Sequence, residues 1–96
     1  LTHPGVLLDR NQFQPKTGEA LSIRIKPGTG GELTIVVYTA SGRIVRRISD
    51  IEQVGNTEWL ARWDGTNEGG KKVSRGVYLI RIKGAGLMEI VKVVVK

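Results

Sequence analysis

The stretch Leu21-Ser22-Ile23-Arg24-Ile25-Lys26 alternates apolar and polar side chains without interruption. Successive side chains of a β-strand point to opposite faces, so this period of two predicts a strand with one buried and one solvated face. Leu21, Ile23 and Ile25 are expected in the core. No stretch of the chain carries a convincing helical period, which indicates a fold built from strands.

The flanking sequence repeats this alternation of strands and turns. Proline and glycine predict a turn at residues 27–31, a second strand follows over 32–38, and residues 39–42 close a hairpin. Residues 49–57 and 64–72 are polar and rich in turn formers, so we expect loops there. Further strands are expected over residues 43–48, 58–63, 77–83 and 88–95.

Two of these strands have unusual patterns. In residues 43–48, Val45 and Ile48 cannot share one face of a regular pleat, which predicts a bulge or an edge position. Residues 88–95 form a nearly continuous apolar run, which predicts burial on both faces or pairing in the middle of a sheet.

The whole pattern predicts an all-β fold, an immunoglobulin- or fibronectin-III-like antiparallel β-sandwich of about seven strands. A chain of 96 residues has the size of one domain. We assign residues 11–96 to the sandwich and residues 1–10 to an N-terminal extended segment that can act as an added or exchanged strand. Pro4 and Pro15 confine pairing near the start to an edge or a strand end.

Composition argues against an enzyme. The chain has no cysteine, hence neither a disulfide nor a thiolate metal site, and no run of about 20 apolar residues that could span a membrane. Its single histidine, His3, is expected at the surface without a companion ligand. Catalysis needs a base, a nucleophile or a metal within reach of one another, and the sequence shows no such set. We therefore expect no catalytic residue, no metal and no cofactor. The first residue, Leu1, indicates a processed terminus or a piece of a longer chain.

Two loops admit a ligand-binding alternative. Asp64, Asn67 and Glu68 offer oxygens to a calcium ion, but the alternate-residue carboxylates of a dedicated loop are missing, so turn capping is the preferred interpretation. The stretch Gly28-Thr29-Gly30-Gly31 could cradle a phosphate, but no Lys-Ser/Thr pair and no helix follow it. A plain turn explains it better.

The net charge of +6 raises the question of an anionic partner. Nucleic-acid binding would need aromatic side chains for stacking, whereas Trp59, Trp63 and Tyr78 are expected in the core, so nucleic acid is disfavoured. Contact with an anionic cell-surface polymer stays open. The basic residues considered for such a face are Arg43, Arg46, Arg47, Lys71, Lys72, Arg75, Arg81 and Lys83.

Three short motifs occur in order, namely Trp63-Asp64-Gly65-Thr66-Asn67, Gly70-Lys71-Lys72-Val73 and Gly76-Val77-Tyr78. Together they resemble the Ig-like domain of the bacterial flagellar hook-capping protein family over about residues 11–96. C-terminal modules of secreted bacterial proteins, including type IX sorting domains, share the pattern. Thr39 departs from it, since the family often has aspartate there. Matching residues outside the three motifs are Asn11, Phe13, Pro15 and Gly42.

The motif residues have structural roles in this interpretation. Asp64 can accept hydrogen bonds from its own turn, and Gly65 can adopt a left-handed conformation. Trp63 is expected to fill the core beside Tyr78. The full structural set is Trp63, Asp64, Gly65, Gly70, Gly76 and Tyr78.

The resemblance implies a non-enzymatic, extracytoplasmic bacterial module, secreted or on the cell surface, with a structural or protein-docking role. A protein partner or a second copy could pair with its sheet edges by β-augmentation. One alternative is a C-terminal secretion-sorting or anchoring domain of a larger protein; another is a carbohydrate- or nucleic-acid-binding module, which exposed tryptophans would favour. The candidate assembly segments are Val6, Leu7 and Leu8, and Val91, Val93, Val94 and Val95.

Overall fold

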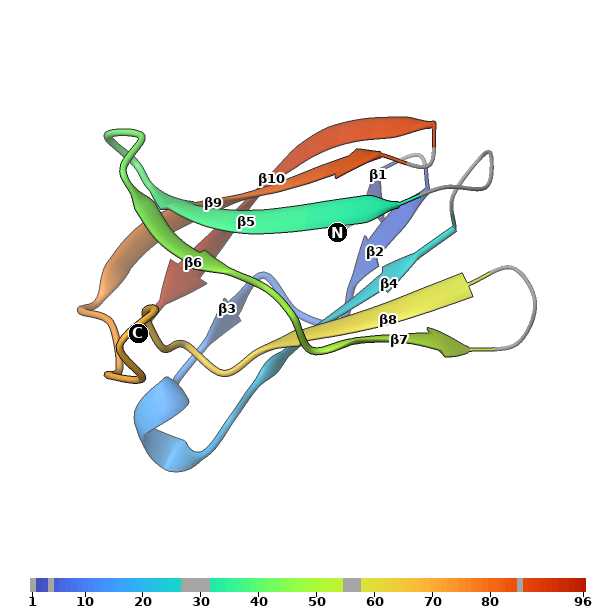
Figure 1. The fold of residues 1–96 in the computed structure, drawn as a ribbon. Helices are drawn as coiled ribbons and strands as arrows, with labels where there is room; N and C mark the ends of the chain where they lie inside the picture. The colour runs from blue at the N-terminus through green and yellow to red at the C-terminus, as the bar shows by residue number, and fades with distance from the viewer. Residues whose placement is uncertain (1, 4, 27–31, 55–57, 85) are drawn as a thin grey trace.

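The computed structural model describes residues 2–3, 5–26, 32–54, 58–84 and 86–96, and two β-sheets packed face to face make up the molecule (Figure 1). The expected turn at residues 27–31 and its phosphate-cradle alternative lie outside these residues, as does the side chain of His3. Over the described residues, no helix has the length and apolar character needed to cross a membrane.

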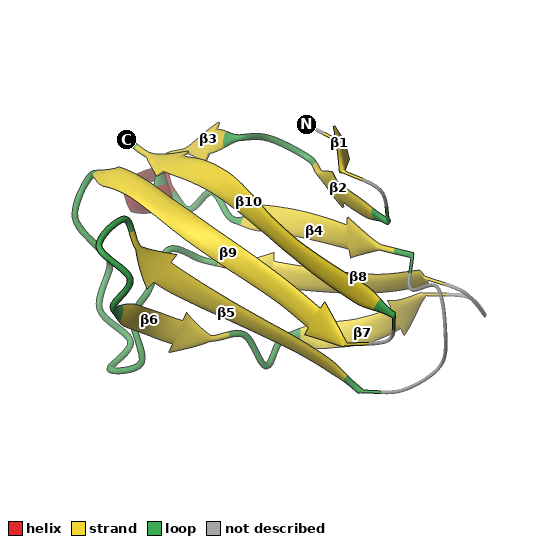
Figure 2. Cartoon of the chain, turned by 90° about the horizontal axis from the view of Figure 1, so that it is seen from above, coloured by secondary structure: helices red, strands yellow, loops and turns green. Residues whose placement is uncertain are grey.

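The first sheet has the strand order β1-β2-β4-β8-β7, and the second has the order β3-β10-β9-β5-β6 (Figure 2). The first sheet comprises β1 (Thr2–His3), β2 (Val6–Leu8), β4 (Leu21–Ile25), β8 (Glu58–Trp63) and β7 (Ile51–Val54). The second comprises β3 (Gln12–Phe13), β10 (Leu87–Val95), β9 (Gly76–Gly84), β5 (Leu33–Thr39) and β6 (Ile44–Arg47), and a 3₁₀ turn, η1 (Pro15–Thr17), links the sheets.

Neighbouring strands are antiparallel except for β3 and β10, which run parallel. The orders β2-β4-β8-β7 and β6-β5-β9-β10 correspond to the A-B-E-D and C′-C-F-G sheets of immunoglobulin domains. The predicted immunoglobulin-like sandwich is therefore confirmed. The extra strands beyond about seven are short ones at the edges.

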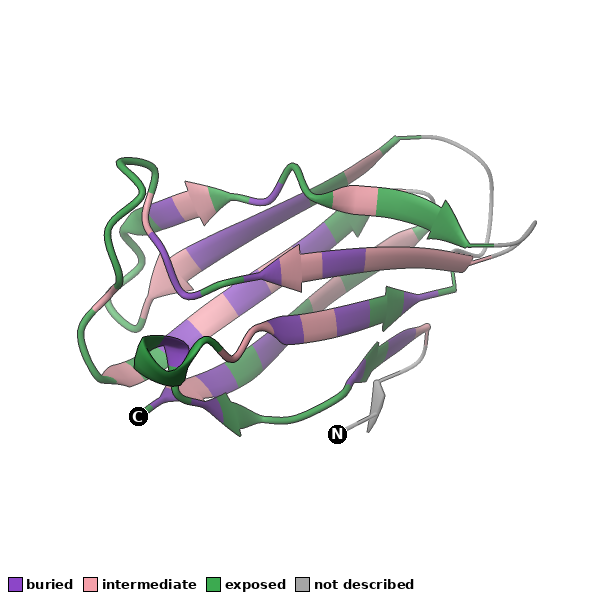
Figure 3. Cartoon of the chain, turned by 90° about the horizontal axis from the view of Figure 1, so that it is seen from below, coloured by how far each residue is buried: buried purple, intermediate pink, exposed green. Residues whose placement is uncertain are grey.

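The core lies between the sheets, and burial alternates along their strands (Figure 3). Leu21, Ile23 and Ile25 of β4 are fully buried, as their alternation predicted. They face a similar row on the other sheet, contributed by β9 and β10. Because each fully buried aliphatic side chain contributes about 1.5–3 kcal/mol, these rows dominate the stability of the sandwich. The facing row consists of Ile80, Ile82, Val91, Val93 and Val95.

The predicted irregularity in β6 is a bulge. Val37 pairs with Arg46 and Tyr38 pairs with Ile44, so Val45 is the extra residue on this edge strand. The extra residue shifts the pleat by one position. Val45 and Ile48 are consequently both buried, at 8% and 6% exposure.

The apolar run of β10 is not buried on both faces, so that part of the prediction was wrong. Val91, Val93 and Val95 are buried, but Met88 and Ile90 on the other face are 55% and 54% exposed. The alternative of an internal position is right, since β10 lies between β9 and β3. Because the outward face of β10 also carries apolar residues, its sequence does not show the alternation of apolar and polar side chains that its burial follows.

Two features differ from the expected loops. Within residues 49–57, which were expected to be a loop, Ile51–Val54 forms the edge strand β7. Only Ile51 is partly buried there, so no apolar alternation marks the strand. Near the N-terminus, β2 pairs with β4 and places Val6 and Leu8 in the core of its own chain.

Candidate functional site

The Trp63-Asp64-Gly65 turn is closed by hydrogen bonds to Thr66. Asp64 Oδ1 accepts from the backbone N–H of Thr66 at 3.1 Å and also from its hydroxyl. The indole Nε1 of Trp63 donates to the carbonyl of Thr66 at 2.9 Å. Thr66 thus provides hydrogen-bond partners for both the Asp64 carboxylate and the Trp63 indole N–H. These bonds fix the direction of the chain at the end of β8.

Gly65 adopts φ +78°, and its conformation brings the turn against Pro15. A Cβ atom at Gly65 would lie 2.3 Å from Cγ of Pro15. Only glycine fits both the left-handed backbone and this approach. Pro15, one of the family matches near the start of the chain, and the Trp-Asp-Gly motif are therefore two sides of one contact.

Three aromatic rings pack edge to face behind this turn. Trp63 makes edge contacts with Phe13 at 5.5 Å and with Tyr78 at 5.7 Å between ring centroids. Trp63 and Phe13 are each 1% exposed, and the hydroxyl of Tyr78 donates to the carbonyl of Ser74 at 2.8 Å. This bond to the backbone just upstream corresponds to the tyrosine corner of immunoglobulin domains.

The loop after the turn is held by side chains that cap it. Asn67 Oδ1 accepts from the backbone N–H groups of Gly69 and Lys71 at 2.9 and 3.1 Å. Glu68 Oε1 accepts from the backbone N–H of Arg47 at 2.8 Å. Because these oxygens point to backbone donors, the geometry matches turn capping rather than a calcium loop. Among the described residues, no group of three histidine or acidic side chains is placed to hold a metal.

Arg46 completes this loop, a role that sequence reasoning missed. Its Nη1 donates to Oγ1 of Thr66 at 2.6 Å and to the carbonyl of Asn67 at 3.0 Å. From the sequence, Arg46 was considered only as one of the basic residues of a possible anion-binding face. A signal for its structural role was available in the bulge, because the shift at Val45 turns Arg46 toward the loop.

The pKa of Asp64 lies below its ordinary value of 3.8, chiefly because its carboxylate accepts the hydrogen bond from the hydroxyl of Thr66. Burial opposes this shift, while the backbone of Thr66 and the charges of Arg46 and Lys72 reinforce it. Burial raises the pKa of Tyr78 above its ordinary value of 10.0. Asp64 is thus ionised and Tyr78 neutral at neutral pH, as their structural bonds require.

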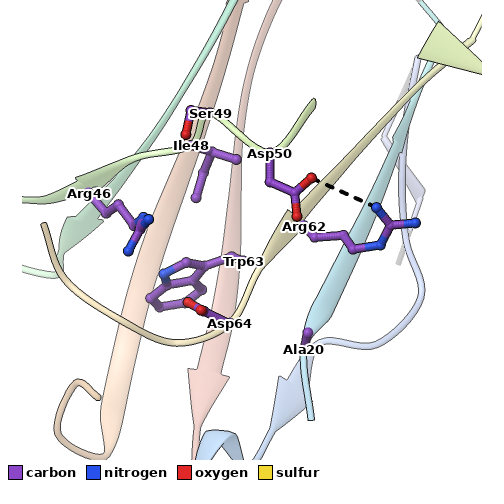
Figure 4. A pocket seen from close by; sticks show the side chains of 8 residues that line it. All are labelled: Ala20, Arg46, Ile48, Ser49, Asp50, Arg62, Trp63 and Asp64. Carbon is purple, nitrogen blue, oxygen red and sulfur yellow. Dashed lines mark ion pairs between the residues drawn. The ribbon is translucent and has the colours of Figure 1, made fainter. Parts of the chain in front are cut away.

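A depression of about 190 Å³ lies beside Trp63, between Arg46 and Arg62 (Figure 4). Arg62 lies 3.9 Å from Oδ1 of Asp50 and 3.5 Å from Oε1 of Glu52, and Arg46 is bound to the loop. Both guanidinium groups beside the depression are therefore engaged, that of Arg62 with acidic side chains and that of Arg46 with the loop after β8.

The assembly segments proposed from the sequence divide into buried and accessible parts. The side chains of Val6, Leu8, Val91, Val93 and Val95 all belong to the core of their own chain. Leu7 is 45% exposed and Val94 is partly buried, both on outer faces.

The backbone edge of β10 is accessible over most of its length. β3 pairs only with Val94 and Val95, so in the described part of the chain no strand lies beside Met88, Ile90 and Lys92 on that edge. The sequence could not indicate this, since both strands belong to distant parts of the chain.

The comparisons with known proteins agree with this architecture. The family described as FlgD Ig-like domain matches residues 10–86. No match was found among curated proteins. A solved structure of PorZ, described as an essential bacterial surface component of the type-IX secretion system of Porphyromonas gingivalis, is similar with a TM-score of 0.64 and 18% identity.

That similarity covers 97% of this chain and 12% of PorZ, and at such identity it shows a shared fold. The family match includes both halves of the contact between Pro15 and Gly65 and the three aromatic rings behind it. By its sequence and by the sandwich built on these motifs, the chain belongs to the FlgD Ig-like domain family.

Proposed function

We propose that this domain is a non-enzymatic docking module of an extracytoplasmic bacterial protein, and that it accepts a strand of a partner protein at the open edge of β10. Membership of the FlgD Ig-like family and the likeness to a bacterial surface component support the structural and extracytoplasmic parts. The single observation that carries the docking part is the edge of β10 away from β9, where no described strand pairs with Met88, Ile90 or Lys92.

The direction of this backbone follows from its pairing with β3. The N–H of Val94 donates to the carbonyl of Asn11, and the N–H of Lys96 donates to the carbonyl of Phe13, each at 2.9 Å. Backbone groups alternate in direction along a strand, so the even-numbered residues before Val94 point to the same side. Met88, Ile90 and Lys92 therefore present their N–H and C=O groups to the open edge.

An added strand would continue the second sheet beyond β10, as in β-augmentation. Its backbone would supply the missing hydrogen bonds, and its outward side chains would lie beside Met88 and Ile90, which are more than half exposed. Natural domains usually cover or shorten such edges because they attract other strands. A long edge left open fits a site that a partner occupies.

A secretion-sorting or anchoring role within a larger protein is the second candidate. The likeness to PorZ, a component of a secretion system, favours it. Both candidates use the module to bind protein. Binding of carbohydrate or nucleic acid is disfavoured, because Trp63 is 1% exposed and Trp59 packs against the core.

Photo-crosslinking in the producing bacterium tests the docking role. A photoreactive residue at position 88, on β10, should give one discrete adduct with another protein, whereas the same residue at the exposed Gln53, on β7, should give none. Lys92→Pro should abolish the adduct without unfolding the domain, since the N–H of Lys92 makes no bond to β9. Val91→Pro should unfold it, because the N–H of Val91 points to β9.

Equal labelling from positions 88 and 53, or an adduct that survives Lys92→Pro, would contradict the proposed edge. No adduct from position 88 would also contradict it. Circular dichroism of the purified Lys92→Pro domain checks that the loss comes from the edge and not from unfolding.

A further inference from the structure

The outer faces of the two sheets differ in how their charges are matched. On the first sheet, Arg24 contacts Glu58 at 2.9 Å, Lys26 contacts the same carboxylate at 3.5 Å, and Arg62 contacts Glu52 at 3.5 Å. The hydrogen bond from Arg24 lowers the pKa of Glu58, so this pair is charged at neutral pH. The face of the first sheet is thus electrostatically compensated by its own side chains.

The outer face of the second sheet carries cations without such partners. Within the described residues, none of its four cations forms an ion pair, and no Asp or Glu occupies an outward position on β10, β9, β5 or β6. Glu32, just before β5, and Glu68 flank the face without an ion pair to its cations in the described residues, and Oε1 of Glu68 binds the backbone N–H of Arg47. The four cations are Arg47, Arg81, Lys83 and Lys92.

Arg81 is held in the middle of this face. Its guanidinium lies 5.3 Å from the centre of the Tyr38 ring, and its Nε is buried with no hydrogen-bond partner. A cation held by an aromatic ring loses little freedom when it meets a carboxylate, so it is prepared for binding. Tyr38 is itself half-buried, and this contact occupies one face of its ring.

Apolar side chains lie among these cations. Cross-strand pairing sets Met88 beside Lys83, and Ile90 beside Arg81. Exposed apolar side chains grouped on one face, with charges between them, are typical of a surface that another protein covers. The exposed members are Val77 at 41%, Ile44 at 53%, Ile90 at 54% and Met88 at 55%.

We infer that the outer face of the second sheet binds an acidic, partly apolar surface of a partner protein. This rests on the proposed docking role and adds the chemistry of the partner to it. A second copy of the chain does not fit, because two faces with unmatched cations repel each other. A polyanion such as nucleic acid or acidic polysaccharide would leave the apolar side chains in water.

The test compares three probes at physiological ionic strength, where charges beyond about 8 Å are screened. The probes are a random copolymer of glutamate and tyrosine, polyglutamate, and heparin. The copolymer should bind at least tenfold more tightly than the other two, as measured by isothermal titration calorimetry. Its binding should fall at least tenfold in Lys83→Glu/Lys92→Glu, and also in Met88→Thr/Ile90→Thr.

A matched variant separates this face from the overall charge. Lys16→Glu/Lys71→Glu makes the same change in net charge at two exposed lysines outside the face, and it should bind the copolymer as the wild type does. Equal binding of all three probes, an equal loss in the matched variant, or no binding of the copolymer would overturn the inference. Each of these results leaves the crosslink from position 88 unaffected, so the docking role is judged separately.

Discussion

Replacing Gly65 by alanine should destabilise the domain far more than the same change at Gly70. Both glycines have left-handed backbones, with φ of +78° and +82°. A Cβ at Gly70 would meet nothing within 4 Å, whereas one at Gly65 would lie 2.3 Å from Cγ and 2.5 Å from Cβ of Pro15. The backbone cost of about 1–2 kcal/mol is therefore common to both, and only Gly65→Ala adds an overpacking cost of about 1–3 kcal/mol.

Urea titration followed by tryptophan fluorescence measures both free energies of unfolding, and thermal unfolding checks them at about 4–8 °C per kcal/mol. In a Pro15→Gly background the overpacking term should disappear, so Gly65→Ala should then cost no more than Gly70→Ala. Equal losses for the two alanine variants in the wild-type background would refute the contact between the two motifs.

Two further predictions concern titration. The pKa of Asp64 is lowered on folding, so the stability that Asp64 contributes is present above pH 3.8 and is lost as the pH falls through its folded value; the difference between wild type and Asp64→Asn in urea titrations should therefore be constant from pH 7 to 5 and shrink below about pH 4. A constant difference down to pH 2 would contradict this. Tyr78→Phe should cost about 0.5–1.5 kcal/mol at pH 7 by removing the bond to Ser74. Because burial raises the pKa of Tyr78, its neutral form is favoured on folding, so wild type should lose stability above pH 10 and Tyr78→Phe should lose less; parallel alkaline curves would count against it.

The sequence predicted those parts of the fold in which one strand face is dry and the other wet. Leu21, Ile23 and Ile25 alternate with polar residues because only one face of β4 packs on the other sheet. The family motifs likewise indicated the turn around Asp64. Such patterns can be recognised in the sequence because the buried and capping residues that form them lie close together along the chain.

Features that depend on distant pairing could not be predicted in this way. The parallel contact of Gln12 with Val94 joins opposite ends of the chain, and β7 is an edge strand with little to bury. The face proposed to bind an acidic partner exists only because pairing places Lys83 beside Met88 and Lys92 beside Leu79. Because this pairing is not visible in the sequence, Lys92 was not among the basic residues considered there.

The parallel arrangement of β3 and β10 has a mechanical consequence. A force that draws the two ends of the domain apart pulls β3 toward its N-terminal side and β10 toward its C-terminal side, along their shared direction. The bonds from Val94 to Asn11 and from Lys96 to Phe13 are then sheared together instead of opening one after another. Phe13, wedged against Trp63, must leave the core in the same event. A surface module tethered at both ends would therefore resist extension first where β2 pairs with β4, and then, once β2 has detached, at this short parallel pair.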